Sequence, residues 1–217
     1  MGVPITYRKD AEAAVKSYDF IDAFENLGYI TYYGVAFSGA YILNRQAIAS
    51  DIPLRSFTGL TSNTPVVLYD KSWDLDFNVP GIIAGAPLFS SLTIEDTQAS
   101  NATMTFRQDL VAYKVDAAGT AVRLAGISGN HISIGANATE SHVMVTKLAL
   151  PKTKIKKGEK LRVQTIALGY VGAGGTECQG KVLQDGAARG TTSYNDTDLA
   201  VKNATNLKVQ IPFNLDL

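Results

Sequence analysis

Apolar and polar residues alternate along most of the chain after residue 28, which is the pattern of strands with one buried face. The alternation is clearest at residues 207–217, where Leu207, Val209 and Ile211 are separated by polar residues and the pattern continues to the last position. β-Branched and aromatic runs of this kind recur, broken by Gly, Pro, Asn and Asp. They predict strands over residues 29–37, 66–69, 73–79, 91–95, 104–115, 121–124, 131–134, 142–150, 160–170 and 207–217.

One segment near the start has a different period. In residues 10–27, apolar residues recur three or four positions apart, and they are followed by Gly28, a residue type that commonly ends a helix. The pattern predicts an amphipathic helix whose apolar stripe includes Val15, Tyr18 and Ile21. This stripe could lie over an end of the sheet or against a neighbouring subunit, and the sequence leaves both placements open.

The order of these segments predicts the fold class. Spacings of about ten residues between runs, with no helical pattern between them, favour antiparallel pairing over a βαβ architecture. We expect an all-β antiparallel sandwich with one N-terminal amphipathic helix or arm. Residues 1–28 would form the arm and residues 29–217 a single domain. Turn sequences at residues 116–119 and 156–159 predict two hairpins.

The last strand contains a proline. Pro212 has no amide hydrogen, so we expect it at a sheet edge or at an unpaired position. Because an exposed edge is a template for another chain, this strand is either covered or part of an interface.

Composition narrows the choice of partners. Charged residues make up only 18% of the 217 residues and balance to a net charge of zero, so we expect no binding of nucleic acid or of an anionic membrane. The first residues lack the pattern of an export leader, and no run of about 18 apolar residues predicts a membrane span. The single cysteine, Cys178, excludes an intramolecular disulfide and a multi-cysteine zinc site.

Candidate metal-binding and catalytic residues are few. Asp74, Asp76 and Asn78 alternate, so a strand would place their oxygen atoms on one face, as calcium prefers. The residues between them are apolar, and the glycine turn and distal Glu of an EF-hand are missing, so a polar solvent-facing surface is the favoured interpretation. His131 and His142, the only histidines, stand in no recognisable triad or metal-binding spacing.

Two glycine-containing stretches resemble active-site motifs only in part. Residues 169–176 lack the Lys-Ser/Thr pair of a phosphate loop, and we expect a flexible loop there. Residues 126–130 miss the last residue of a nucleophile elbow. We therefore expect no catalytic residue, no cofactor and no metal, and we predict that the protein is not an enzyme. A hydrolase assembled from residues distant in the sequence is the remaining enzymatic alternative.

Two further groups of residues bear on binding. Six cationic residues between positions 152 and 162 are interrupted by Glu159 and are not interleaved with aromatic residues, which favours solvated strand ends over a nucleic-acid site. Tyr29 and Tyr33 share one face of their strand and Tyr32 takes the other. We expect the tyrosines of one face to lie in the core, and those of the other face are a candidate contact surface for sugar or protein.

Several of these segments together resemble a known class of proteins. An amphipathic N-terminal segment is followed by low-charge hairpins such as residues 113–120 and 150–163, and the chain finishes in the bare strand 211–217. This arrangement resembles the jelly-roll structural proteins of tailed-phage virions. The resemblance implies a jelly-roll fold and a capsid-associated or head-to-tail subunit, of the decoration or accessory type, that is placed in many copies.

The same resemblance implies where the protein acts and with what. It would be made in the host cytoplasm, reside in the virion, form a homo-oligomer and contact other virion proteins such as the major capsid or head-to-tail proteins. The alternative is a binding module of the same fold that recognises carbohydrate or a host receptor through loop tyrosines and Trp73. We predict that the N-terminal segment and the last strand form subunit contacts, with the interface residues Val15, Tyr18, Ile21, Ile211, Phe213 and Leu215.

Overall fold

Every regular element that the structure describes is a strand. The computed structural model describes residues 16–17, 27–37, 40–45, 55–76, 81–83, 85–96, 103–135, 141–172, 178–183 and 207–214. All strand pairs in these residues are antiparallel, which confirms the predicted all-β antiparallel sandwich. The strands are β1 (Lys16–Ser17), β2 (Leu27–Phe37), β3 (Ala40–Asn44), β4 (Arg55–Leu60), β5 (Val66–Asp76), β6 (Gly81–Ile83), β7 (Pro87–Asp96), β8 (Met104–Val115), β9 (Ala121–Ile134), β10 (Ser141–Ala149), β11 (Thr153–Ile155), β12 (Lys160–Val171), β13 (Cys178–Leu183) and β14 (Lys208–Asn214).

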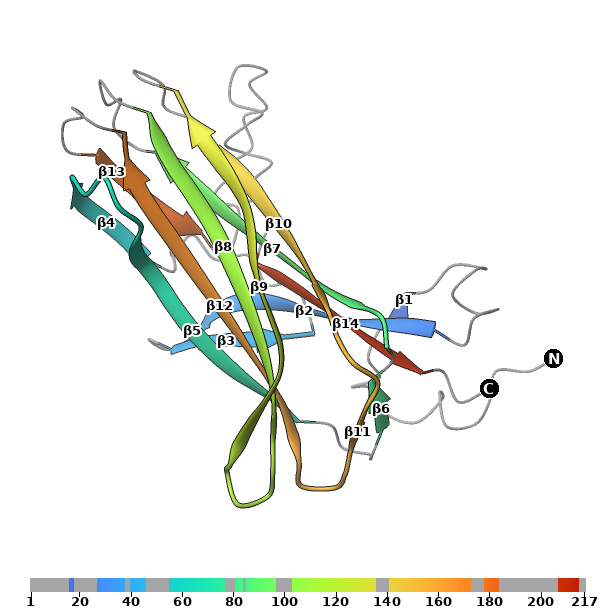
Figure 1. Ribbon diagram of the computed structural model, residues 1–217. Coiled ribbons are helices and arrows are strands. Elements are labelled where there is room, and N and C mark those ends of the chain that lie inside the picture. The colour runs from blue at the N-terminus through green and yellow to red at the C-terminus, as the bar shows by residue number, and fades with distance from the viewer. Residues whose placement is uncertain are drawn as a thin grey trace, which may run out of the picture.

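Eight of these strands form a jelly roll. The chain crosses between two sheets at most connections, apart from the hairpin that joins β8 to β9. The resulting orders are β4-β13-β7-β10, here called sheet A, and β5-β12-β8-β9, here called sheet B. This is the strand order of a jelly roll. Figure 1 shows the long strands of sheet B running side by side along the strands of sheet A.

The C-terminal strand widens sheet A. β13 pairs with residues 93–96 of β7, and β14 continues along the same edge of β7 at residues 89–91. β2 then pairs with β14, while β1 and β3 pair with the other edge of β2. Pro212 pairs with Tyr29 of β2 but lies beyond the last pair with β7, so on that side it stands at an edge of β14, one of the two positions expected for this proline.

Two local predictions need correction. Within the helix predicted for residues 10–27, Lys16 and Ser17 instead pair with Ile30 and Tyr29 as a short strand, and the rest of that segment before Leu27 lies outside the described residues. The division into an arm at 1–28 and a domain at 29–217 therefore stays a prediction. The second turn, at residues 156–159, joins β11 to β12, but β11 pairs with β6, so this connection is not a hairpin.

The predicted hairpin between β8 and β9 is confirmed. Its turn is held by Asp116, whose carboxylate accepts hydrogen bonds from the amides of Ala118 at 2.9 Å and Thr120 at 2.8 Å. Gly119 adopts a positive φ of 90°, a conformation that glycine takes at little cost. The turn fixes the start of β9 and hence its register on β8.

Between the sheets, a belt of polar side chains separates two hydrophobic clusters. The upper cluster includes Phe57, Leu92 and Phe106, and the lower cluster includes Leu88 and Leu110. On each of four strands the residue between the two clusters is polar, and none of the four is more than 4% exposed. The members of this polar belt are Ser90 of β7, Gln108 of β8, Thr146 of β10 and Thr165 of β12.

Gln108 connects the two sheets through this belt. Its Nε2 donates to Ser90 Oγ at 2.9 Å, and its Oε1 accepts from Thr146 Oγ1 at 3.2 Å. Gln108 stands at an irregularity of the β8–β9 pairing, between Arg107 and Asp109. Because buried polar side chains are costly unless paired, these bonds select one alignment of sheet B on sheet A.

Candidate functional site

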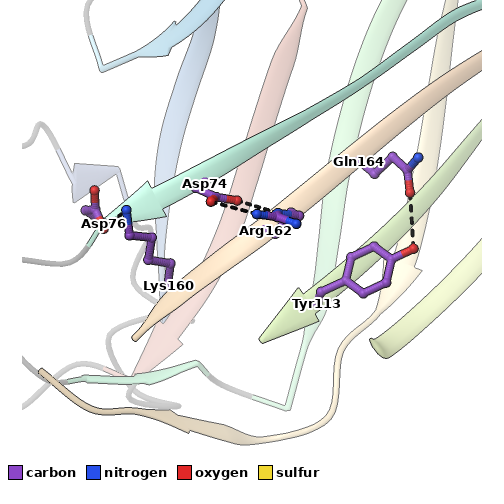
Figure 2. A network of polar contacts seen from close by, with 6 residues as sticks. All are labelled: Asp74, Asp76, Tyr113, Lys160, Arg162 and Gln164. Carbon is purple, nitrogen blue, oxygen red and sulfur yellow. Dashed lines mark hydrogen bonds and ion pairs between the residues drawn. The ribbon is translucent and has the colours of Figure 1, made fainter. Parts of the chain in front are cut away.

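The outer face of sheet B carries a network of polar side chains, shown in Figure 2. Arg162 of β12 lies opposite Asp74 of β5, and its Nε and Nη2 donate to the two carboxylate oxygens at 2.5 Å and 2.9 Å. Such paired bonds are the strong geometry of the arginine–carboxylate contact. These hydrogen bonds, aided by the Arg162 charge, hold the pKa of Asp74 below its usual value. Beside them, Lys160 Nζ lies 3.3 Å from Asp76 Oδ1.

Gln164 extends this network across three strands. Its Oε1 accepts a hydrogen bond from the Tyr113 hydroxyl of β8 at 3.2 Å, and its Nε2 donates to Asp70 Oδ1 of β5 at 2.8 Å. The network therefore ties the outer faces of β8, β12 and β5 together. Its polar groups satisfy one another, which is the expected arrangement of a structural surface.

The Asp74–Arg162 pair predicts a small, pH-dependent contribution to stability. Because the pKa of Asp74 is lowered in the folded chain, the stabilisation is present above the ordinary aspartate pKa of about 3.9 and is lost as the pH falls through the lower folded value. We expect Asp74→Asn to reduce the free energy of unfolding at pH 7 by roughly 0.5 kcal/mol, since both side chains are about a third exposed.

Urea denaturation at pH 7 and pH 3 checks this expectation. The difference between Asp74→Asn and wild type should shrink toward zero at pH 3. Asp76→Asn is the matched control and should cost less at pH 7, because Asp76 is 66% exposed and makes a single longer contact. An equal loss for Asp74→Asn at both pH values would contradict the assignment.

The residues considered for a metal or for catalysis are not brought together. Asp74 and Asp76 each face a cation, and Asn78 lies outside the described residues. In the described ranges, no three His, Cys, Asp or Glu side chains lie close enough to hold a metal ion. His131 and His142 stand on strands of different sheets, and the His131 ring packs at 6.2 Å against Tyr170.

The glycine stretches and the lysine cluster take structural positions. The expectation of a loop from residue 169 is wrong at its start, because residues 169–171 belong to β12, while residues 173–177 lie outside the described ranges. Residues 126–130 are part of β9 and form no strand-turn-helix elbow. Within the cationic cluster, Glu159 pairs with Lys114 at 2.8 Å, and hydrogen bonds from Lys114 and the Lys156 amide lower the pKa of Glu159.

The six residues predicted to form an interface fall into two groups. Ile211 is fully buried in the lower cluster, and the half-buried Phe213 packs against the same cluster, so both contribute to the core of their own chain. An additional contact of β14 with a partner stays a prediction. The remaining four, Val15, Tyr18, Ile21 and Leu215, lie outside the described side chains.

The tyrosines of β2 divide between the two faces as the alternation predicts. Tyr32 is buried in the lower cluster, whereas Tyr29 and Tyr33 are half-buried on the outer face of sheet A. There the Tyr29 ring lies 6.0 Å from that of Phe89 on β7, and Lys208 Nζ lies 5.9 Å from the Tyr33 ring. This aromatic group was visible in the sequence only in part, because Phe89 reaches it through strand pairing.

Trp73 does not belong to such a surface. It is 6% exposed and lies in the upper cluster, where its ring is 6.5 Å from that of Tyr69. The ligand contact that the alternative binding module assigned to Trp73 is therefore wrong, and the core position that its alternation with Asp74 indicates is confirmed. The reason is its position on β5, where it alternates with the outward-facing Ser72 and Asp74 and so points between the sheets.

Two neighbouring edge strands expose apolar side chains. β9 is an edge of sheet B, β10 is an edge of sheet A, and the two pack beside one another. Val122 on β9 is 62% exposed and Val145 on β10 is 63% exposed, and Ile127 and Val143 are also exposed. Among the 14 residues of β9 only Ile134 is fully buried.

Two open hollows border sheet B. The larger, of about 410 Å³, lies between β3 and β5 and is lined by Ile42, Leu43 and residues 71–75. The smaller, of about 290 Å³, lies on the outer face and is lined by Ser72, Tyr113, Ala121, Arg162 and Gln164. No helix in the described part of the chain is long and apolar enough to cross a membrane.

The fold thus defines a jelly-roll protein. No protein-family model and no curated protein matches the sequence. Among solved structures, a CocE/NonD family hydrolase from Staphylococcus aureus matches 73% of this chain and 37% of its own at 14% identity, with a TM-score of 0.44. A chain of infectious bursal disease virus, Gx strain, matches 86% of this chain and 47% of its own at 7% identity, with a TM-score of 0.30.

A third solved structure also matches with low sequence identity and a low TM-score. The VP2 protein of infectious bursal disease virus, in T=1 particles, matches 87% of this chain and 45% of its own at 11% identity, with a TM-score of 0.22. The chain spans about a third of the hydrolase and under half of the viral chains. The predicted resemblance to virion proteins holds only as a loose likeness to viral β-sandwich chains, and none of these three proteins comes from a phage.

The hydrolase match corrects one prediction from the sequence. The expectation that the protein is not an enzyme is contradicted by two hydrolase structures among the neighbours. That expectation was based on missing motifs, and catalytic residues can be assembled from segments distant in the sequence. With TM-scores below 0.5, the likenesses carry no argument about the chemistry or assembly of this chain.

Proposed function

We propose that the protein is a structural subunit of a virion, capsid-associated or placed at the head-to-tail region, that assembles in many copies. In this proposal it is made in the host cytoplasm and contacts copies of itself and other virion proteins through its edge strands and N-terminal arm. The jelly roll supports the proposal, since viral capsid domains use this fold, although lectins and cupins use it too.

The observation that carries the proposal is the exposed edge strand β9. Natural sheets protect their edges with short strands, charges, prolines or a covering segment, because a bare edge pairs with other chains. β9 is 14 residues long, contains no proline, and carries Arg123 as its one permanently charged residue. Its exposed Val122 and Ile127 add apolar area that a partner would bury.

Size-exclusion chromatography with light scattering tests this proposal. We expect the wild-type chain to form oligomers, and Val122→Lys to raise the dissociation constant by roughly tenfold, because a buried lysine must lose its hydration. Val145→Lys is the matched control. It has nearly the same exposure, 63% against 62%, but lies on the edge of the other sheet, so it should assemble like wild type.

Two results would count against this function. A strictly monomeric wild-type chain at high concentration would contradict self-assembly. Equal effects of Val122→Lys and Val145→Lys would show that the edge of sheet B has no special part in it.

A second candidate function is a module that binds carbohydrate or a host receptor. The observation that favours it is the aromatic group on the outer face of sheet A, where Tyr29, Tyr33 and Phe89 lie beside Lys147 and Lys208. Aromatic rings next to polar groups are typical of sugar-binding surfaces. A glycan array separates the two functions, because only the binding module would retain a sugar while remaining monomeric.

A further inference from the structure

We propose that copies of this chain join head to tail through sheet B, with the β9 edge of one copy paired to the β5 edge of the next. The inference rests on the proposed function and names the contact that the assembly would use. In the described part of the chain, β5 and β9 are the two ends of sheet B, and each pairs with only one neighbour. Each therefore has one side without a paired strand, and on β9 part of that side packs beside β10 near Gly129.

The strand directions allow a regular junction. Sheet B has four strands, and every neighbouring pair is antiparallel. β5 and β9 therefore run in opposite directions. When the β9 edge of one copy meets the β5 edge of another in the same orientation, the new pair is also antiparallel, and the sheet continues without a break in its pattern.

The two edges carry opposite charge. β5 itself contains three aspartates, Asp70, Asp74 and Asp76, and one lysine, Lys71, and two of the aspartates pair with Lys160 and Arg162 of β12. β9 contains no acidic residue. Arg123, which is exposed, makes no ion pair with any described residue. A β9 edge therefore attracts a β5 edge and repels a second β9 edge.

The register of the sheet aligns these charges. Strand pairing places Asp74, Arg162, Tyr113 and Arg123 in one row across the outer face, with Asp74 at the β5 end and Arg123 at the β9 end. A junction in the same register brings Arg123 of one copy beside Asp74 of the next. Two positions further along, the row has Asp76 at the β5 end and Ala121 at the β9 end.

The apolar surfaces of the two edges also complement one another. The hollow of about 410 Å³ beside β5 has apolar walls at Ile42 and Leu43 of β3 and polar walls at Lys71, Ser72 and Asp74 of β5, and Ile42 is 39% exposed. β9 brings the exposed Val122 and Ile127. Pairing would cover the apolar part of the hollow and the exposed apolar side chains of β9 together.

Such a contact joins two different surfaces, so it does not close with two copies. It generates a ring if the rotation per copy closes and a helical filament if it does not. Because the twist of β-sheets turns each strand by roughly 20° relative to its neighbour, successive copies are rotated and a flat ribbon is not expected.

Disulfide trapping tests the junction. In a Cys178→Ala background, which removes the single native cysteine, Asp76→Cys and Ala121→Cys are prepared as separate chains. We expect a cross-linked dimer on mild oxidation only when the two chains are mixed, because residues 76 and 121 meet only across a head-to-tail contact. Val145→Cys mixed with Asp76→Cys is the control and should give no dimer.

The outcomes separate this inference from the proposed function. Dimers from either single variant alone would show a two-fold contact and overturn the head-to-tail junction. The absence of a cross-link in the mixture, while light scattering still reports oligomers, would also overturn it but leave the structural role standing. A monomeric wild-type chain would overturn both the head-to-tail junction and the proposed structural role.

Discussion

Gly129→Ala is expected to lower the free energy of unfolding by about 2–3 kcal/mol, with a fall in melting temperature of roughly 5–10 °C. Gly129 lies on β9 where the polar belt comes close to the strand. A methyl group there would overlap the carbonyl oxygen of Gln108 and lie 2.6 Å from Thr146 Oγ1. The backbone oxygen cannot move without distorting β8, so the hydrogen bonds of the belt would be strained or lost.

Gly135→Ala is the matched control for this prediction. It is also a glycine at the end of the same strand region, but an added methyl group there meets no atom within 4 Å. Thermal and urea denaturation of both variants should show a large loss for Gly129→Ala and a change within about 0.5 kcal/mol for Gly135→Ala. Similar values for the two variants would show that close approach at Gly129 does not limit stability.

The second large effect is expected at Phe106, the aromatic anchor of the upper cluster. Phe106→Ala should lower the free energy of unfolding by about 3–5 kcal/mol. The side chain is 1% exposed, and its ring lies 6.1 Å from that of Phe57, which comes from β4 of the opposite sheet. Gly169 lies opposite it on β12 and leaves room for the ring. Removing the ring would open a cavity between the sheets.

Phe89→Ala offers the same chemical change on the outside of the sandwich. Because Phe89 is only half-buried on sheet A, we expect a loss of about 1–2 kcal/mol. Guanidinium denaturation should rank the two variants clearly. If Phe89→Ala costs as much as Phe106→Ala, the upper cluster does not hold the sheets together in the way that the contacts indicate.

Gly129 and Phe106 both lie next to the polar belt, because Gln108 approaches Gly129 and follows Phe106 by two positions on β8. A sandwich held by apolar contacts alone could let one sheet slide on the other by a strand position, since hydrophobic contacts are not directional. Gln108 bonds to Ser90 and Thr146, which stand on two different strands of sheet A. A rigid alignment of this kind keeps the β5 and β9 edges in fixed places, as a subunit that joins other copies requires.

Strand periodicity was strong enough to locate the longer strands. Residues 104–115 were predicted as a strand and form β8 with the same bounds, and residues 160–170 form β12 with one residue more. The predicted run 66–69 and the described part of the run 73–79 are one strand, β5 (Val66–Asp76), because residues 70–72 continue the strand instead of forming a turn. The predicted runs 121–124 and 131–134 are likewise one strand, β9, since residues 125–130 continue it.

The shorter strands were missed for a different reason. β3, β4, β6, β11 and β13 are three to six residues long, which is too short for a periodic pattern to stand out. They are strands because longer neighbours supply their hydrogen-bond partners. Lys16 and Ser17, within the helix predicted for residues 10–27, form a strand for the same reason: two residues are too short to show a strand period, and β2 supplies their partners.

The candidate sites also include features that the sequence indicated and contacts that it did not. The sequence indicated that Asp74 and Asp76 face solvent and that Tyr29 and Tyr33 share a face, because alternation depends only on neighbours along the chain. It gave no sign that Asp74 meets Arg162, which lies 88 positions away, or that Gln108 meets Thr146, which lies 38 positions away. The sequence also led to the prediction that the protein is not an enzyme, which the comparisons contradict. Motif searches detect only residues that are close in the sequence.

The sequence by itself therefore determined the all-β class, the positions of the long strands and the face on which each of their side chains lies, because these follow from a period of two residues. Only the tertiary structure decided the jelly-roll order, the polar belt and the opposite charges at the two edges of sheet B. Those features depend on which strands pair and in what register, and the free energy that selects one pairing is distributed over contacts between residues far apart in the chain.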